Sequence, residues 1–244
     1  LDAPNVARWE AFVAGCPEAT FFHRAGWRTV IERAFGHRTH FIYAESDGAI
    51  TGVLPLVEIK SILFGHSLVS LPFCVYGGIA ATRDDARQAL DEQAQSLAAQ
   101  LGVGHLEYRN LSRRHSDWHC KDLYVTFRKA ITADDEANMN AIPRKQRAMV
   151  RKGIKAGLVG EIDQDIERFY IAYATSVRNL GTPVFSRRYF ELLRETFGGD
   201  CEVLSILKKL HADGKTVIII THDPNVAKEC QRIIRLKDGQ LVKG

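Results

Sequence analysis

The sequence lacks the paired cysteines that a disulfide framework or a structural metal site requires. None of its five cysteines belongs to a C-x-x-C pair, and they are scattered over the chain at positions 16, 74, 120, 201 and 230. This usage favours a reducing compartment, so we expect a cytoplasmic protein. The longest strongly apolar stretches run about ten residues, well short of a membrane-spanning helix. No basic-then-apolar leader opens the chain, which begins Leu1-Asp2-Ala3-Pro4 without methionine, and we expect the natural start to lie upstream.

The sequence also lacks a strong excess of charge of one sign. Its formal net charge is +4, and 45% of its 244 residues are apolar. This composition is typical of a globular protein with one large domain or two small ones. A mild positive charge is compatible with anionic ligands but does not by itself indicate nucleic acid.

Apolar spacing and turn residues predict an α/β fold. Apolar residues at helical spacing predict a helix around Trp27–Ala34, which Gly36 ends, and a longer one over Asp84–Leu101. Asp47-Gly48, between two runs of strand character, predicts a tight hairpin. Four more strands are expected at 67–71, 78–80, 105–111 and 121–129, the first two of them paired with each other. We therefore expect a mixed sheet with packed helices.

The second half of the chain begins with a basic stretch, "IPRKQRAMVRKGIKAGL". Six cations stand within twelve residues without an acidic partner, at Arg144, Lys145, Arg147, Arg151, Lys152 and Lys155. Their spacing predicts a helix with several of them on neighbouring faces. Two more helices are expected over 165–180 and 187–197.

Residues up to about 203 resemble the FemAB family, and within it the branch associated with exosortase (PEP-CTERM) systems. The stretches that carry the resemblance are "TFFHRAGWRTVIERAFGH", "GVLPLVEIKS.LFG", "SLPFCVYGGI", "HLEYRN", "KDLYVTFRK", "IPRKQRAMVRKGIKAGL" and "SVRNLGTPVFSRRYFELLRETFGGDCEVL". The resemblance implies two domains of the Gcn5-related acetyltransferase (GNAT) fold, a first over 1–135 and a truncated second over 136–203. It also implies N-acyl or aminoacyl transfer, with an acyl donor such as aminoacyl-tRNA and an amine acceptor, feeding cell-envelope, peptidoglycan or exopolysaccharide assembly.

Residues 204–244 resemble the carboxyl end of an ABC-transporter ATPase of the lipoprotein- or macrolide-export type. The stretch "LKKLHADGKTVIIITHDPNVAKECQRIIRLKDGQLV" resembles a helix, a buried strand, the switch histidine and a closing hairpin of that family. By this resemblance His222 is a remnant of the residue that contacts a γ-phosphate. We expect "SILKKLHADG" to form a short helix. We also expect the tail to be a β-α-β piece of an ABC ATPase joined to the unrelated residues 1–203, which makes the chain a chimera.

An ATP site is not expected in this tail. A phosphate-binding loop needs G-x-x-x-x-G-K-[ST] between a strand and a helix. Gly214-Lys215-Thr216 matches its end, but Lys209 stands at the place of the first glycine. No "LSGGQ" signature and no acidic Walker B strand occurs in the sequence. An ATP-binding transporter subunit therefore remains an alternative function of which only the carboxyl-terminal piece is present.

Two groups of residues are candidates for substrate binding. In the first half they are Tyr76, Gly77, Gly78 and Arg109, because glycines admit a close ligand and an arginine holds anions. Their alternatives are a glycine-assisted turn and an ion pair between Arg109 and Glu107. In the second half they are Arg144, Lys145, Arg147, Arg151 and Lys152, which suit a phosphate of tRNA or a diphosphate. Their alternative is a solvated helix face, or the anion site of a non-enzymatic binding module.

The sequence names no catalytic base and no cofactor. Glu107, Tyr76 and Tyr108 carry suitable groups, but no spacing singles one out. "AQLGVG" lacks the Gln or Arg that a coenzyme A loop needs at its first position. Ile31 stands where cytosolic peptidoglycan members carry a lysine for uridine diphosphate, so a nucleotide-linked acceptor is not expected. His115 and His119 lie in a polar loop, and no metal is predicted. Since the family's acceptor channel uses both domains, we expect catalysis to be impaired.

Overall fold

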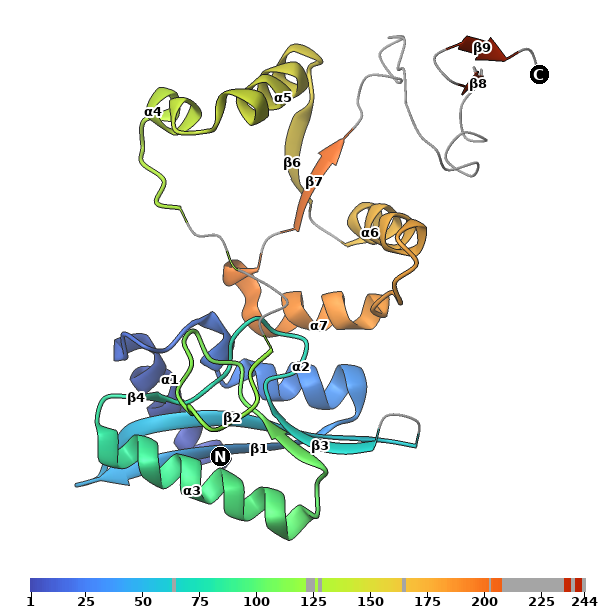
Figure 1. The fold of residues 1–244 in the computed structure, drawn as a ribbon. Helices are drawn as coiled ribbons and strands as arrows, with labels where there is room; N and C mark the ends of the chain where they lie inside the picture. The colour runs from blue at the N-terminus through green and yellow to red at the C-terminus, as the bar shows by residue number, and fades with distance from the viewer. Residues whose placement is uncertain are drawn as a thin grey trace. The chain divides into compact units, whose positions relative to one another are not determined.

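The computed structural model describes residues 1–62, 65–121, 126, 129–163, 166–201, 203–207, 235–237 and 240–242. The chain divides into two compact units (Figure 1). The first unit comprises residues 1–126 and 186–201, and the second comprises 127–185 and 202–244. The domain boundaries near 136 and 204 that the sequence suggests stay a prediction.

The first unit is built on a five-stranded mixed sheet. Its strands are β1 (Arg38–Ser46), β2 (Ala49–Ser61), β3 (Gly65–Ser70), β4 (Ala80–Ala81) and β5 (His105–Glu107). The order along the sheet is β1-β2-β3-β5, and β4 also pairs with β2. The first three strands are antiparallel, whereas β3 and β5 run parallel. The fold is therefore mixed α/β, as the sequence predicts.

Helices cover both faces of this sheet. Helix α3 (Asp84–Leu101) packs on one face of β1 and β2, while α1 (Val6–Gly15) and α2 (Gly26–Phe35) pack on the other (Figure 1). Helix α7 (Arg187–Phe197) packs against α2. The described residues of this unit also form the 3-10 turns η1 (Ala3–Asn5), η2 (Phe21–His23) and η3 (Gly198–Asp200).

The core follows from the two-residue alternation of the strands. On the α3 face, Leu54, Leu56 and Leu68 are fully buried against Leu90 and Ala94 of the helix. On the opposite face, Val53, Val57 and Phe41 point toward α1 and α2, and the Trp9 ring stacks on Phe41 with centroids 5.4 Å apart. Each face therefore has its own apolar layer, and β2 is buried on both sides.

Several local predictions are confirmed and one pairing is wrong. The hairpin turns at Asp47 and Gly48, which both have positive φ, and Gly36 and Gly102 end α2 and α3 in the left-handed conformation. The predicted pairing of 67–71 with 78–80 does not occur. Both strands pair with β2 instead, β3 along its second half and β4 at Gly52 and Val53. One long central strand thus serves two partners on the same edge.

The second unit contains three helices and short antiparallel ladders among the residues that the structure describes. The helices are α4 (Asp135–Asn140), α5 (Arg144–Lys155) and α6 (Glu167–Asn179). Strand β6 (Val159–Asp163) pairs with β7 (Val203–Leu207), and β8 (Arg235–Lys237) pairs with β9 (Gln240–Val242). The terminal hairpin is therefore confirmed.

The predicted helix "SILKKLHADG" is wrong at its start. Ser205, Ile206 and Leu207 belong to β7, where they face Glu161, Gly160 and Val159 across the ladder. The available partner strand overrides the local amphipathic pattern. The rest of that helix, the strand 217–220 and His222 lie outside the described residues. In the described part of the chain, no helix is both long and apolar enough to cross a bilayer.

Candidate functional site

The carboxyl ends of the parallel strands β3 and β5 meet at one edge of the first unit's sheet. Loop 71–79 leaves β3 at this edge, and Tyr108 and Arg109 follow β5 there. In open α/β sheets, ligands bind beyond the carboxyl ends of the strands. This edge of the sheet is therefore the candidate ligand-binding site of the first unit.

Loop 71–79 has a strained backbone. Leu71 and Phe73 adopt φ values of 50° and 68°, in the left-handed region that non-glycine residues rarely occupy. Each such residue costs on the order of 1–2 kcal/mol, and it persists only where the surroundings hold it in place. Leu71 is fully buried, and the Phe73 ring stacks on Phe35 with centroids 4.2 Å apart. Packing holds the loop in this shape.

The structure brings together the four candidates from the first half of the sequence. The backbone amides of Gly77 and Gly78 both donate to the Arg109 carbonyl, at 3.1 and 3.2 Å. The Arg109 guanidinium donates to the Cys74 carbonyl at 2.7 Å and pairs with Glu107 at 3.0 Å. The Tyr76 ring makes an edge contact with Phe22, with centroids 6.2 Å apart. Arg109 thus ties the loop to the end of β5.

The two glycines are required by contacts within the protein. A Cβ on Gly78 would stand 1.8 Å from the side-chain oxygen of Asn110. One on Gly77 would stand 2.6 Å from the Leu71 Cβ and 3.0 Å from the Ser70 carbonyl oxygen. Both amides already have an acceptor, so this arrangement accounts for the glycines without a ligand. A binding role for Tyr76, Gly77, Gly78 and Arg109 stays a prediction.

His23 is the residue of this edge that the sequence analysis missed. Its side chain is 3% exposed, and its Nε2 lies 2.8 Å from the Gly78 carbonyl oxygen. The Thr20 backbone amide donates to its Nδ1 at 3.0 Å, which assigns the ring proton to Nε2. Burial lowers the pKa of His23, so the ring is neutral. In the sequence, only the spacing Thr20-x-x-His23 could have indicated this role of His23, because its other partner, Gly78, is 55 residues away.

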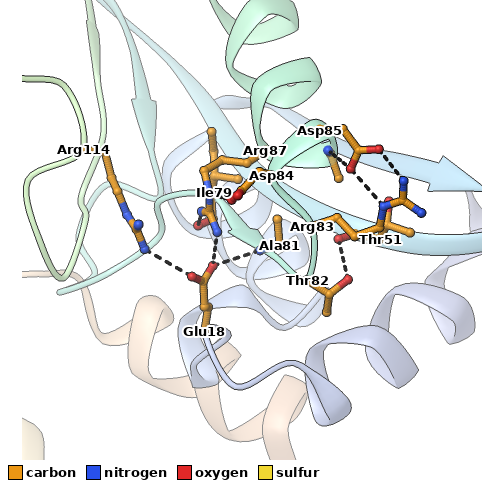
Figure 2. Close-up of polar contacts among 11 residues, drawn as sticks. Glu18, Thr51, Ile79, Ala81, Thr82, Arg83, Asp84, Asp85, Arg87 and Arg114 are labelled. Carbon is orange, nitrogen blue, oxygen red and sulfur yellow. Dashed lines mark hydrogen bonds and ion pairs between the residues drawn. The ribbon is translucent and has the colours of Figure 1, made fainter.

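Glu18 forms the densest polar node near this edge. Figure 2 shows its carboxylate between three donors, the guanidinium groups of Arg87 and Arg114 and the amide of Ala81. The distances are 2.7 Å to Arg87 and 3.2 Å to each of the other two. Burial raises the pKa of Glu18, but these hydrogen bonds and charges outweigh it and leave the pKa below its usual value. The node joins the α1–α2 connection to β4, to α3 and to the segment after β5.

Substituting this carboxylate provides a test of the node. We expect Glu18→Gln to lower the free energy of unfolding by about 1 kcal/mol, because the Glu18 side chain is 35% exposed and solvent screens part of its pairing. Since the folded-state pKa is depressed, the contribution is present above the unfolded-state pKa and is lost as the pH falls through the folded-state value. Urea unfolding at pH 7 and pH 4 measures the free energy of unfolding of both proteins. If the wild type exceeds Glu18→Gln by the same amount at both pH values, the expectation is contradicted.

Tyr108 does not have the surroundings of a general base. Its hydroxyl donates to Asp91 at 2.8 Å, and its ring stacks on Trp118 with centroids 5.4 Å apart. Burial, followed by the hydrogen bond and the negative charge of Asp91, raises its pKa far above the usual value. His115 lies 3.4 Å from the same carboxylate, and its ring stacks on Trp118. This cluster fixes the segment after β5 on α3.

The basic candidates line helix α5 in the second unit. Arg144, Arg147, Arg151, Lys152 and Lys155 line one shallow hollow along the helix, with the small Ala148 between them. Arg147 is also bound within the protein, since its guanidinium donates to the carbonyls of Asn140 and Ile142 at 2.7 and 2.9 Å. It therefore fixes the end of α4 against α5. Lys145 is exposed outside the hollow.

Two other expectations concern groups away from these sites. Ile31 is fully buried in α2, so this position offers no side chain to a nucleotide. Over the described ranges no group of three or more His, Cys, Asp or Glu residues has metal-binding geometry.

Comparisons with known proteins agree with parts of this description. No family model matches the chain. The fold is similar to that of FemX, with a TM-score of 0.51, over 86% of this chain and 54% of that one. The chain thus spans about half the length of this neighbour, and at 15% sequence identity the likeness shows the fold alone.

A short stretch is similar to macrolide export proteins. It is 61% identical over 41 residues to the macrolide export ATP-binding/permease protein MacB of Bradyrhizobium diazoefficiens, which covers 17% of this chain and 6% of that protein. The identity to MacB 2 of Yersinia pestis is 54% over 48 residues, or 20% of this chain and 7% of the relative. These matches support an ABC-type fragment only weakly.

Proposed function

We propose that the body of this chain is a Fem-type acyltransferase that takes an activated acyl group, such as that of aminoacyl-tRNA, and transfers it to an amine. The observation that carries the proposal is the likeness of the fold to FemX over 86% of the chain. In this reading the chain carries two GNAT-like domains, over 1–135 and 136–203, the second of them truncated. The cytoplasm is the compartment that such a donor implies, and the link to exosortase systems remains part of the proposal.

The basic face of α5 is the proposed donor-binding surface. Arg144, Arg151 and Lys155 follow each other along one side of the helix over about 16 Å, at a rise of about 1.5 Å per residue. A diphosphate occupies only a small part of such a length, whereas each strand of a nucleic-acid duplex carries a phosphate about every 3.4 Å along the axis, so several phosphates fit along it. The row formed by Arg144, Arg151 and Lys155 therefore favours a polymer with several phosphates as the ligand.

Binding of aminoacyl-tRNA tests this proposal. We expect the double variant Arg144→Gln/Arg151→Gln to bind tRNA about tenfold more weakly at low salt and with a smaller salt dependence, because two charged contacts are lost. The matched control is Arg33→Gln/Arg38→Gln in the first unit, which removes the same charge from other exposed arginines. Equal tRNA affinity of both double variants, or no tRNA binding by the wild-type protein, contradicts the proposal.

Transfer of a labelled amino acid from the tRNA to a primary amine separates an enzyme from a binding module. We expect slow turnover at most, since the acceptor channel of the family uses both domains. A titration with ATP separates the transferase from a transporter ATPase. Because the sequence contains no G-x-x-x-x-G-K-[ST] loop, we expect no saturable ATP binding.

A further inference from the structure

Helix α5 has a second face that the proposed donor site does not use. Met149 and Val150 lie on the side of the helix opposite Arg144 and Lys155, and Ile154 lies at the border of that side, about a quarter turn from these cations, at about 100° per residue. Their exposures are 66%, 40% and 62%. An apolar helix face in a globular domain is normally buried, so this one stands out.

The apolar face continues past the end of the helix. Gly157 adopts a φ of 67° and its amide donates to the Ile154 carbonyl, while the Leu158 amide donates back to the Gly153 carbonyl. This C-terminal turn places Leu158, which is 42% exposed, beside Gly153. Four exposed apolar side chains therefore form one stripe, which we call the apolar stripe (Met149, Val150, Ile154 and Leu158).

Cations border the apolar stripe on both sides. Lys145 and Lys152 flank it beside Met149, and Arg151 flanks it near Ile154, as follows from the helical positions. Arg147 also lies beside Ile154, but its guanidinium is bound to the carbonyls of Asn140 and Ile142. No acidic residue occurs between 137 and 160. Long basic side chains at the borders keep their charges at the level of lipid headgroups while the apolar side chains between them enter the acyl region.

We propose that the apolar stripe of α5 docks on an anionic lipid surface. A basic amphipathic helix with an exposed apolar face lies in the interface plane of a bilayer, and each cation near the surface adds to the attraction by acidic headgroups. A nucleic acid would use the cations but would gain nothing from Met149 and Ile154. The exposed apolar residues therefore favour the lipid, and the proposal does not depend on the acyl-transfer reaction.

Vesicle sedimentation of the full chain tests the proposal. Vesicles of phosphatidylcholine with about a third phosphatidylglycerol are expected to bind the protein, and pure phosphatidylcholine vesicles to bind it at least about tenfold more weakly. Met149→Ser/Ile154→Ser is expected to reduce binding to the anionic vesicles about tenfold. The control Ile131→Ser changes a side chain outside the stripe that is even more exposed, at 83%, and this variant is expected to bind as the wild type does.

A second variant keeps the test independent of any change in helix stability. Lys145→Gln/Lys152→Gln removes two border cations and is expected to weaken binding to anionic vesicles about tenfold. Single-stranded oligonucleotide binding is measured beside it and is expected to survive Met149→Ser/Ile154→Ser. Vesicle binding that also survives this apolar variant, or that is absent in the wild type, assigns α5 to phosphate contacts alone and overturns the proposal.

Discussion

Replacing Gly77 by alanine is expected to lower the free energy of unfolding of the first unit by about 3 kcal/mol. The added Cβ would stand 2.6 Å from the Leu71 Cβ and 3.0 Å from the Ser70 carbonyl oxygen. Neither neighbour can move easily, because Leu71 is fully buried in a left-handed conformation and Ser70 belongs to β3. Forcing a methyl group into such a site costs about 1–3 kcal/mol, and more where backbone must shift.

The effect reaches the end of β5 through the backbone. Any displacement of Gly77 lengthens its hydrogen bond to the Arg109 carbonyl, and the neighbouring bond from Gly78 shares that acceptor. We therefore expect Gly77→Ala to loosen the whole edge of the sheet. Urea unfolding measures the loss of stability, and hydrogen exchange of the amides in loop 71–79 measures the loosening.

Gly15→Ala is the matched control for this substitution. Gly15 is the last residue of α1, and no atom lies within 4 Å of the Cβ that alanine would add. Alanine is expected to leave stability unchanged within about 0.5 kcal/mol or to raise it slightly, because it favours helix. If Gly77→Ala behaves like Gly15→Ala, the tight packing described for loop 71–79 is wrong.

The parts of the fold that the sequence predicted well are those set by local chemistry. The limits Asp84–Leu101 and Arg187–Phe197 agree with α3 and α7. Both helices have apolar residues along one side and a glycine directly after their last residue. Both of these signals act within one or two helical turns. The Asp47-Gly48 hairpin is local in the same sense, because the turn itself requires positive φ.

The errors concern choices between partners that are distant in the sequence. Strand β4 pairs with Gly52 and Val53, although β3 is closer to it along the chain. Residues 205–207 have a helical pattern but join β6. In both cases the pairing depends on which strand has a free edge in the folded protein. The spacing of apolar residues in the sequence does not contain that information.

The candidate site shows the same division. The glycines and the arginine of "FCVYGGI" and "HLEYRN" stand out by residue type, and the structure does bring them together. Their contacts to Asn110, Leu71 and Cys74 were not predictable, because each joins two segments that meet only in the folded sheet. Residue type therefore singled out residues that lie together in the fold, and the structure was needed to show what they contact there.

Replacing His23 by alanine is expected to cost about 3 kcal/mol at neutral pH. The His23 side chain is 3% exposed, so its loss leaves a cavity. It also removes the partner of two polar groups, the Thr20 amide before η2 and the Gly78 carbonyl in the strained loop. Thermal or urea unfolding at pH 8 measures the difference from the wild type.

The pH dependence of that difference tests the neutral state of His23. Burial lowers the pKa of His23 in the folded protein below its usual value of 6.5. Between the folded-state pKa and 6.5 the unfolded chain binds more protons at this position, so stability increases with pH there, by up to about 1.4 kcal/mol per pH unit. The advantage of the wild type over His23→Ala is therefore expected to be largest above pH 6.5 and to shrink as the pH falls through this range.

The other titrating groups are common to both proteins and cancel in the difference. An advantage that stays constant or grows on acidification would mean that His23 binds a proton in the fold at least as readily as in the unfolded chain. A protonated ring cannot accept the hydrogen bond of the Thr20 amide, so the account of how loop 71–79 is held would then be wrong.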